Sequence, residues 1–124
     1  MSTRMTDLWV YSGSGWGSGT DITGYKVEAM DGSIGKIDRA TYETDASYVV
    51  VDTGPWIFGK KVVLPAGVID HIDARDETVY IHRTKDEIKN APEFGDSRFD
   101  KAYREKLGTY YGPGGRGYRE RSVR

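Results

Sequence analysis

Short runs rich in β-branched residues follow one another from Tyr25 to His82, and turn residues separate them. Glycine, proline and aspartate recur between the runs, and these residues favour turns over regular structure. Such a succession is typical of a small antiparallel barrel or sandwich. We therefore expect a mainly β fold, a small antiparallel β-barrel with one or two short C-terminal helices and flexible tails.

The stretch "DGSIGKIDRA", residues 31–40, predicts the first hairpin. Asp31 and Gly32 tolerate the positive φ angles of a tight turn, and the second strand runs from 34 to 42. The apolar spacing breaks strict alternation once, which predicts a β-bulge around Arg39. A bulge there would let the sheet curl.

Three further stretches predict the remaining strands. "SYVVVDTG", residues 47–54, is a β-branched run typical of a central strand buried on both faces. "VVLP", residues 62–65, ends at Pro65, which lacks the N–H that a strand ladder needs. Two strands at 68–73 and 78–82 flank "ARDE", a connection suited to a hairpin. These stretches predict five or six strands.

Two helices are expected after the strands. Thr84 and Glu87 form a capping-box pattern, and Pro92 prevents continuation of that short helix. A second helix is predicted from 98 to 107, capped by Asp96 or Ser97 and stopped by Gly108. Its apolar stripe comprises Phe99, Ala102, Tyr103 and Leu107. Either the chain's own barrel or a second subunit must cover that stripe.

The composition divides the chain into four segments: a flexible arm at 1–20, a domain at 21–94, an amphipathic helix at 95–108 and a basic tail at 109–124. Small residues in "SGSGWGSG" cannot bury enough apolar surface to offset chain entropy, so order should begin near Asp21. The aromatic residues of the arm either fold back onto the domain or anchor a partner. They are Trp9, Tyr11 and Trp16. The glycines of residues 112–124 predict disorder in that part of the tail.

The residues offer little support for catalysis or metal binding. The chain has no cysteine, which excludes disulfides and thiolate chemistry. His71 and His82 could at most share a metal between subunits, and we expect them on sheet faces beside Asp70 and Asp73. The acids of "DHIDARDE" fit a solvated turn better than proton exchange, so we expect no catalytic residues, no metal and no cofactor. An enzymatic role of Asp70, Asp73 or His71 is the less favoured alternative.

The stretch "GPWIFGKK", residues 54–61, combines aromatic and basic side chains that either face a partner or enter the core. The candidate partner-binding residues are Trp56, Ile57, Phe58, Lys60, Lys61, Phe99, Tyr103 and Leu107. The candidate nucleic-acid contacts are the tail arginines Arg116, Arg119, Arg121 and Arg124. With a net charge of −1, any basic site must be local.

Residues 22–94 resemble a PRC-barrel domain, on the evidence of four stretches. They are "ITGYKVEAMDGSIGKIDRATYE", "YVVVDTG", "FGKKVVLP" and "VYIHRTKDEIKNAPEF". This domain is shared by the cytoplasmic part of the photosynthetic reaction-centre H subunit and the C-terminal domain of RimM-type ribosome maturation factors. The resemblance implies a stand-alone bacterial binding or assembly module without catalysis, and it names no partner. The membrane helix of the former and the N-terminal barrel of the latter have no counterpart here, so neither role transfers.

The expected function is therefore a non-catalytic protein-binding or assembly module that pairs with itself, because an unpaired strand edge favours a symmetric homodimer. The alternative is an RNA- or ribosome-linked assembly factor that uses the basic tail. No stretch approaches the roughly 20 apolar residues of a membrane span, so we expect a cytoplasmic protein.

Overall fold

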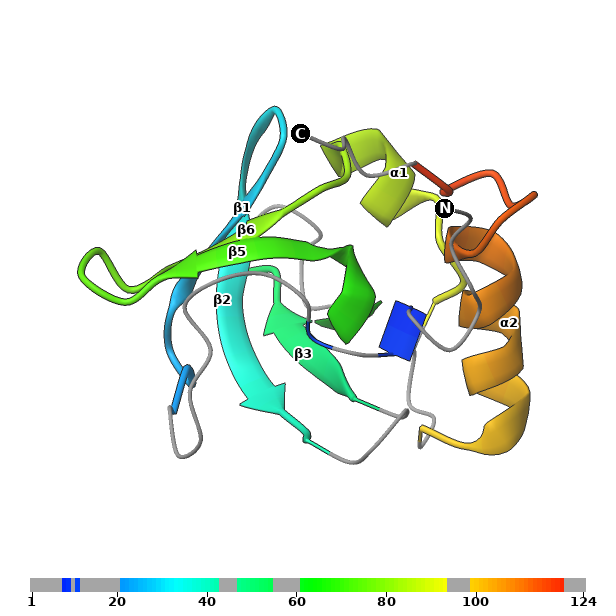
Figure 1. Cartoon of the computed structure of the whole chain (residues 1–124), viewed down its shortest axis with the longest axis horizontal. Helices are drawn as coiled ribbons and strands as arrows, with labels where there is room; N and C mark the ends of the chain where they lie inside the picture. The colour runs from blue at the N-terminus through cyan, green and yellow to red at the C-terminus, as the bar shows by residue number, and fades with distance from the viewer. Residues whose placement is uncertain are drawn as a thin grey trace.

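The computed structural model describes residues 8–9, 11, 21–42, 47–54, 61–93 and 99–119. In this part of the chain a six-stranded sheet precedes two helices (Figure 1). The strands are β1 (Lys26–Ala29), β2 (Gly32–Ala40), β3 (Tyr48–Asp52), β4 (Lys61–Pro65), β5 (Ile69–Asp73) and β6 (Thr78–Ile81). A 3-10 turn, η2 (Ala66–Val68), lies between β4 and β5, and the helices are α1 (Lys85–Lys89) and α2 (Lys101–Tyr111). No helix of the described residues is long and apolar enough to cross a membrane.

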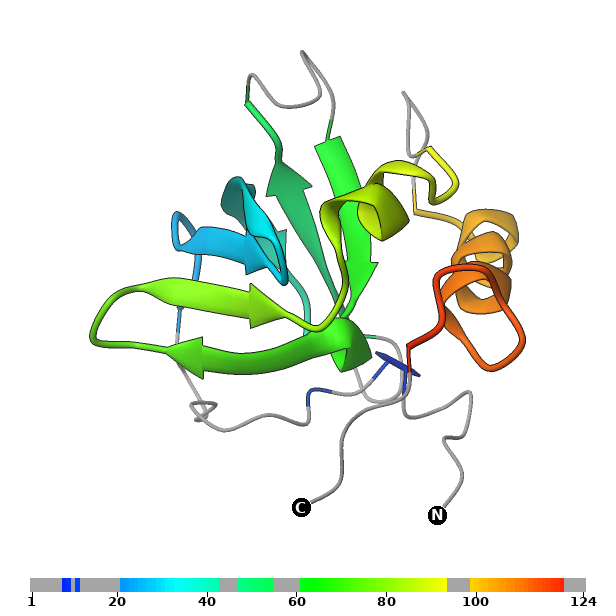
Figure 2. The ribbon, with the colours of Figure 1, turned by 90° about the horizontal axis from the view of Figure 1, so that it is seen from above.

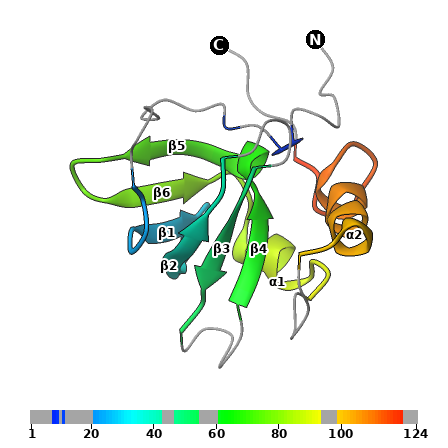
Figure 3. The same ribbon diagram turned by 90° about the horizontal axis from the view of Figure 1, so that it is seen from below.

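The fold is mainly β, as predicted, but the sheet is mixed and open. Its strand order is β4-β3-β2-β1-β6-β5, and β1 pairs with β6 in parallel while the other neighbours are antiparallel. The two edge strands, β4 and β5, are consecutive. Strand β4 runs into η2, and β5 continues from it in a different direction (Figures 2 and 3). The sheet therefore curls without β4 pairing to β5, and closure into an antiparallel barrel is not shown.

The first hairpin forms where it was predicted, and two glycines shape it. Gly32 and Gly35 have φ angles of 148° and 147°, in the region that favours glycine. A Cβ atom on Gly35 would lie 2.0 Å from the carbonyl oxygen of Asp52, so the lack of a side chain lets β2 approach β3. The register of β2 against β3 shifts between Ile37 and Arg39, which confirms the bulge. The strand ends at Ala40, two residues before its predicted end at 42.

The other strand predictions are confirmed within a residue or two. Three consecutive valines of β3 are buried, so this strand packs on both faces. Strand β4 ends at Pro65. Between β5 and β6 the carboxylate of Asp73 accepts hydrogen bonds from the N–H groups of Arg75 and Asp76, at 3.0 and 3.1 Å. This acid therefore stabilises the turn, as the sequence suggested.

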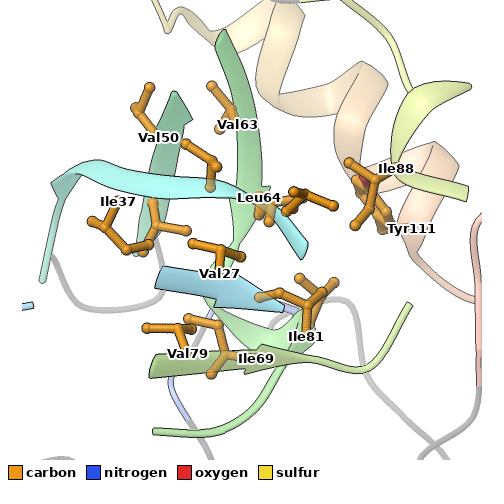
Figure 4. Packing of buried hydrophobic residues seen from close by; sticks show 14 of the residues in the cluster. Val27, Ile37, Val50, Val63, Leu64, Ile69, Val79, Ile81, Ile88 and Tyr111 are labelled. Atoms are coloured by element: carbon orange, nitrogen blue, oxygen red, sulfur yellow. The ribbon is translucent and has the colours of Figure 1, made fainter. Parts of the chain in front are cut away.

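The hydrophobic core lies inside the curl of the sheet (Figure 4) and also includes residues of the N-terminal arm. Leu8 is buried, and Trp9 is only 4% exposed. Trp9 packs edge-on against Phe99, with 5.7 Å between ring centroids, and the Arg104 guanidinium lies 5.0 Å from the Trp9 ring. The expectation that order begins near Asp21 is therefore wrong at these positions, because Trp9 folds back and packs tightly. Trp16 lies outside the described residues.

Helix α1 begins with the predicted capping box. Glu87 N–H donates to the Thr84 hydroxyl, and Thr84 N–H donates to the Glu87 carboxylate at 2.8 Å. The first hairpin also contributes, because the Asp31 carboxylate accepts a hydrogen bond from the N–H of Lys85 at 2.8 Å. Side chains therefore satisfy three of the N–H groups around the start of this short helix.

Helix α2 is shifted toward the C-terminus relative to the prediction. The predicted N-cap was Asp96 or Ser97, but the N-cap is Asp100. Its carboxylate accepts a hydrogen bond from the N–H of Tyr103 at 2.8 Å. The helix continues through Gly108 to Tyr111. Glycine costs a helix interior about 1 kcal/mol, which packing can offset, and Gly108 is buried. A local stop signal was therefore overridden by tertiary contacts.

Candidate binding groove on helix α2

A groove of about 680 Å³ lies beside α2 and the chain that follows it. Figure 1 shows this chain folding back next to the helix. The groove is mostly apolar and carries charged groups. It is lined by Pro92, Ala102, Glu105, Lys106, Thr109, Tyr110, Gly114, Gly115 and Arg116. The groove is open to solvent and is not an enclosed cavity.

One face of α2 packs into the core, and another lines the groove. Tyr103, Leu107 and Tyr111 are buried in the core, and the last two are 0% exposed. The groove-lining positions 102, 105, 106 and 109 recur at intervals of three or four residues, so they share another face of the helix. The core contacts therefore hold the helix that presents the groove.

The predicted stripe on α2 is thus covered by this chain's own core, which was one of the two alternatives. Tyr103 and Leu107 have too little exposed surface to meet a second subunit. Phe99 precedes the helix and stacks on Tyr48, with 3.9 Å between ring centroids. Ala102, assigned to the same stripe, is exposed and lines the groove.

Two tyrosine hydroxyls attach α2 to the segment that contains α1. The hydroxyl of Tyr103 donates to the carbonyl oxygen of Pro92 at 3.0 Å, which fixes one groove residue to the helix. The hydroxyl of Tyr110, which itself lines the groove, donates to the carbonyl oxygen of Glu87 at 2.5 Å and so fixes this side chain to α1. Burial raises the pKa of both hydroxyls, so they remain protonated donors at neutral pH.

Tyr111 offers a matched comparison, because its buried hydroxyl has no hydrogen-bond partner among the described residues. Removing an unsatisfied buried hydroxyl avoids a desolvation cost, so Tyr111→Phe is expected to raise the free energy of unfolding by about 1 kcal/mol. Tyr103→Phe removes a made hydrogen bond and should lower it by about 1 kcal/mol. Urea unfolding followed by circular dichroism measures both. A larger loss for Tyr111→Phe than for Tyr103→Phe would contradict this account.

The C-terminal glycines form a close-packed loop, whereas disorder was predicted from residue 112 onward. A Cβ atom on Gly115 would lie 2.1 Å from the carbonyl oxygen of Thr109 and 2.2 Å from that of Tyr110. A Cβ on Gly117 would lie 2.2 Å from the Tyr110 ring, and Gly117 N–H donates to the Tyr110 carbonyl at 2.9 Å. Glycine at these positions permits contact with the end of α2.

A buried arginine holds the far end of this loop. Arg83 is 4% exposed, and its Nε donates to the carbonyl oxygen of Gly117 at 2.6 Å. Another guanidinium nitrogen donates to the carbonyl oxygen of Tyr111 at 3.4 Å, and the guanidinium lies 5.7 Å from the centroid of the Tyr111 ring. Arg83 therefore connects the end of β6 to the end of α2 and to the loop.

Glu87 holds the last described residue. The Arg119 guanidinium donates to both carboxylate oxygens of Glu87, at 3.3 and 3.2 Å. Partial burial alone would raise the pKa of Glu87, but Thr84 N–H and Arg119 outweigh it, so that pKa lies below its usual value. The resulting stabilisation is present at neutral pH and is lost as the pH falls through the lowered pKa.

The predicted tail arginines therefore differ in their surroundings. Arg119 is engaged with Glu87, whereas Arg116 is exposed and lines the groove. Arg121 and Arg124 lie outside the described residues. The two described arginines, Arg116 and Arg119, are thus not equivalent.

The loop predicted to meet a partner is described only at its ends. Trp56, Ile57, Phe58 and Lys60 lie outside the described residues. Lys61 begins β4, and its ammonium group lies 3.1 Å from the carboxylate of Asp38 in an exposed ion pair. Exposed pairs of this kind contribute little to stability.

The histidines lie apart from the groove. The Nδ1 of His71 lies 2.7 Å from the Asp70 carboxylate, and its ring stacks on Tyr80 with 4.5 Å between centroids. His82 follows β6, and its backbone N–H donates to the carbonyl oxygen of Val68. His71 thus has the acidic neighbour that the sequence suggested. Within the described ranges, no three His, Cys, Asp or Glu residues are grouped to hold a metal ion.

A scan against models of known protein families finds no match, and a search of the curated proteins finds no similar chain. The PRC-barrel resemblance therefore remains a prediction from the four sequence stretches. The mainly β fold agrees with it at the level of fold class.

Proposed function

We propose that this chain is a non-catalytic protein-binding or assembly module of the PRC-barrel type, and that the groove on α2 is its binding surface. The observation that supports the proposal is the groove, because it combines an apolar lining with charged groups on a helix that packs into the core. Apolar area supplies affinity, and a few polar groups fix the orientation of the bound segment.

The support of the groove favours binding without rearrangement. Three kinds of contact hold the residues that line the groove. They are the core packing of α2, the hydrogen bonds Tyr103–Pro92 and Tyr110–Glu87, and the close packing of the glycine loop. A surface ordered before binding loses less conformational entropy when a partner arrives. This arrangement supports a preformed docking site.

Self-association is a second part of the proposal. Strands β4 and β5 stand at the ends of the sheet order, and an uncovered strand edge can pair with the same edge of a second copy. We therefore expect a symmetric dimer in light scattering at micromolar concentration. A monomer under those conditions would remove this part and leave the groove proposal in place.

Filling the groove tests the proposed function. Ala102→Trp places a large side chain on the groove face, whereas Lys101→Trp changes the neighbouring exposed residue that does not line the groove. Tagged chains are incubated with native-host lysate, and retained proteins are quantified by mass spectrometry. Ala102→Trp should reduce the specific partner about tenfold, a free-energy change of about 1.4 kcal/mol, and Lys101→Trp should retain it. Equal retention by both variants would contradict the proposal.

The alternative is an RNA-linked function of the basic tail. Of the tail arginines, Arg116 is exposed and lines the groove, together with the exposed Lys106 of α2. Ribonuclease treatment of the same captures separates the two functions. A partner that disappears with ribonuclease, and whose binding weakens steeply with salt, would favour RNA. A nuclease-resistant partner would favour protein binding.

A further inference from the structure

We infer that the groove takes a short peptide segment of a partner protein in which a carboxylate side chain stands beside apolar side chains. This inference rests on the proposed function and names the chemistry of its partner. It follows from the charged side chains that line the groove and from the position of Arg116 in the loop after α2.

The groove carries more positive than negative groups. Lys106 and Arg116 line it together with Glu105. None of these three side chains makes an ion pair with a described residue. Glu105 and Lys106 are adjacent on the helix, where neighbouring side chains diverge and do not face each other. The local surplus of positive charge contrasts with the net charge of −1 of the whole chain.

Of the two arginines described after α2, only Arg116 lines the groove. Arg119 is engaged by Glu87, whereas Arg116 stands in the groove lining between the close-packed Gly115 and Gly117. Arg116 also acts on Tyr110, where its charge partly offsets the rise in the pKa of that hydroxyl caused mainly by burial. The planar guanidinium of an arginine is suited to two hydrogen bonds with one carboxylate.

The remaining lining suits the apolar part of such a peptide. Pro92, Ala102 and Tyr110 provide apolar surface, and Gly114 and Gly115 add wall without side chains. A peptide that combines leucine with glutamate therefore matches both kinds of lining group.

Synthetic peptides test the inference with the full-length chain. Fluorescein-labelled peptides combine leucine with glutamate, glutamine or lysine in one fixed order, and fluorescence anisotropy measures their binding. The glutamate peptide is expected to bind about tenfold more tightly than the lysine peptide. Lys106→Glu with Arg116→Glu should reverse this order. The matched control is Lys36→Glu with Arg39→Glu on β2, which makes the same charge change at exposed positions outside the groove lining and should preserve it.

The outcomes separate the inference from the proposed function. In one outcome all three peptides bind equally, and Ala102→Trp abolishes that binding. This result would overturn the charge preference and leave the groove as a protein-binding site. A glutamate preference that survives the charge reversal would place the acidic ligand elsewhere and overturn the inference. Binding of none of the peptides would also overturn it, while the lysate capture decides the proposed function independently. Binding of a uridine oligonucleotide in their place would assign the basic groups to RNA.

Discussion

Gly35→Ala is expected to lower the free energy of unfolding by about 3 kcal/mol or more, because the new methyl group has no space in the β2–β3 ladder. A Cβ atom would lie 2.0 Å from the carbonyl oxygen of Asp52 and 2.9 Å from the Cα of Thr53. These are backbone atoms, which cannot rotate away as a side chain could. The φ angle of 147° is also unfavourable for any residue with a side chain. Changes that combine strain with lost packing belong to the most destabilising class of single mutations.

Gly54→Ala is the control for the backbone conformation alone. Gly54 also has a positive φ, 55°, but a Cβ atom there would meet nothing within 4 Å. Its expected cost is about 1 kcal/mol from the left-handed conformation. Urea unfolding of both variants, followed by circular dichroism, gives the difference. Similar losses for Gly35→Ala and Gly54→Ala would show that β2 can move away from β3 at little cost.

Ending the chain after Gly108 is expected to prevent stable folding. This truncation removes Tyr111, which is fully buried, together with the carbonyl groups of Tyr111 and Gly117 that accept hydrogen bonds from Arg83. Loss of a large buried aromatic side chain alone costs about 3–5 kcal/mol, and leaving a buried arginine without these partners adds to that cost. Small domains have a total stability of about 5–15 kcal/mol, so most of it would be lost.

A chain that ends after Arg119 provides the control, because it keeps every contact described for the loop. We expect this chain to unfold cooperatively with nearly the same urea midpoint as the full chain. The chain that ends after Gly108 should lack a cooperative transition and should exchange its amide hydrogens rapidly. A cooperative transition in the shorter chain would show that the domain ends before the loop.

The parts of the fold that depend on local chemistry could be predicted from the sequence. The Asp31-Gly32 turn, the bulge before Arg39 and the Thr84–Glu87 capping box each depend on residues within one short stretch. The parallel pairing of β1 with β6 joins strands far apart in the chain, and no local pattern encodes it. An antiparallel barrel was therefore expected where the structure has an open, mixed sheet.

The groove could be predicted only in part, for the same physical reason. The spacing of positions 102, 105, 106 and 109 shows that they share a helical face, but the apolar stripe drew attention to the other side of α2. The glycines near the C-terminus suggest disorder when considered by composition alone. Their fixed positions depend on contacts with Thr109, Tyr110 and Arg83, and those contacts exist only in the folded chain.

Glu87 limits how this chain can diverge in evolution. Its carboxylate accepts from Thr84 at the start of α1 and from Arg119 after the loop, while its carbonyl oxygen accepts from Tyr110 on α2. Aspartate is one methylene shorter, and glutamine keeps an acceptor oxygen while losing the charge that attracts arginine. A change of this side chain would therefore disturb the bonds to Thr84 and Arg119, whereas the bond from Tyr110 to the backbone carbonyl would remain. Descendants of this chain should vary Glu87 less than the partial exposure of its side chain suggests.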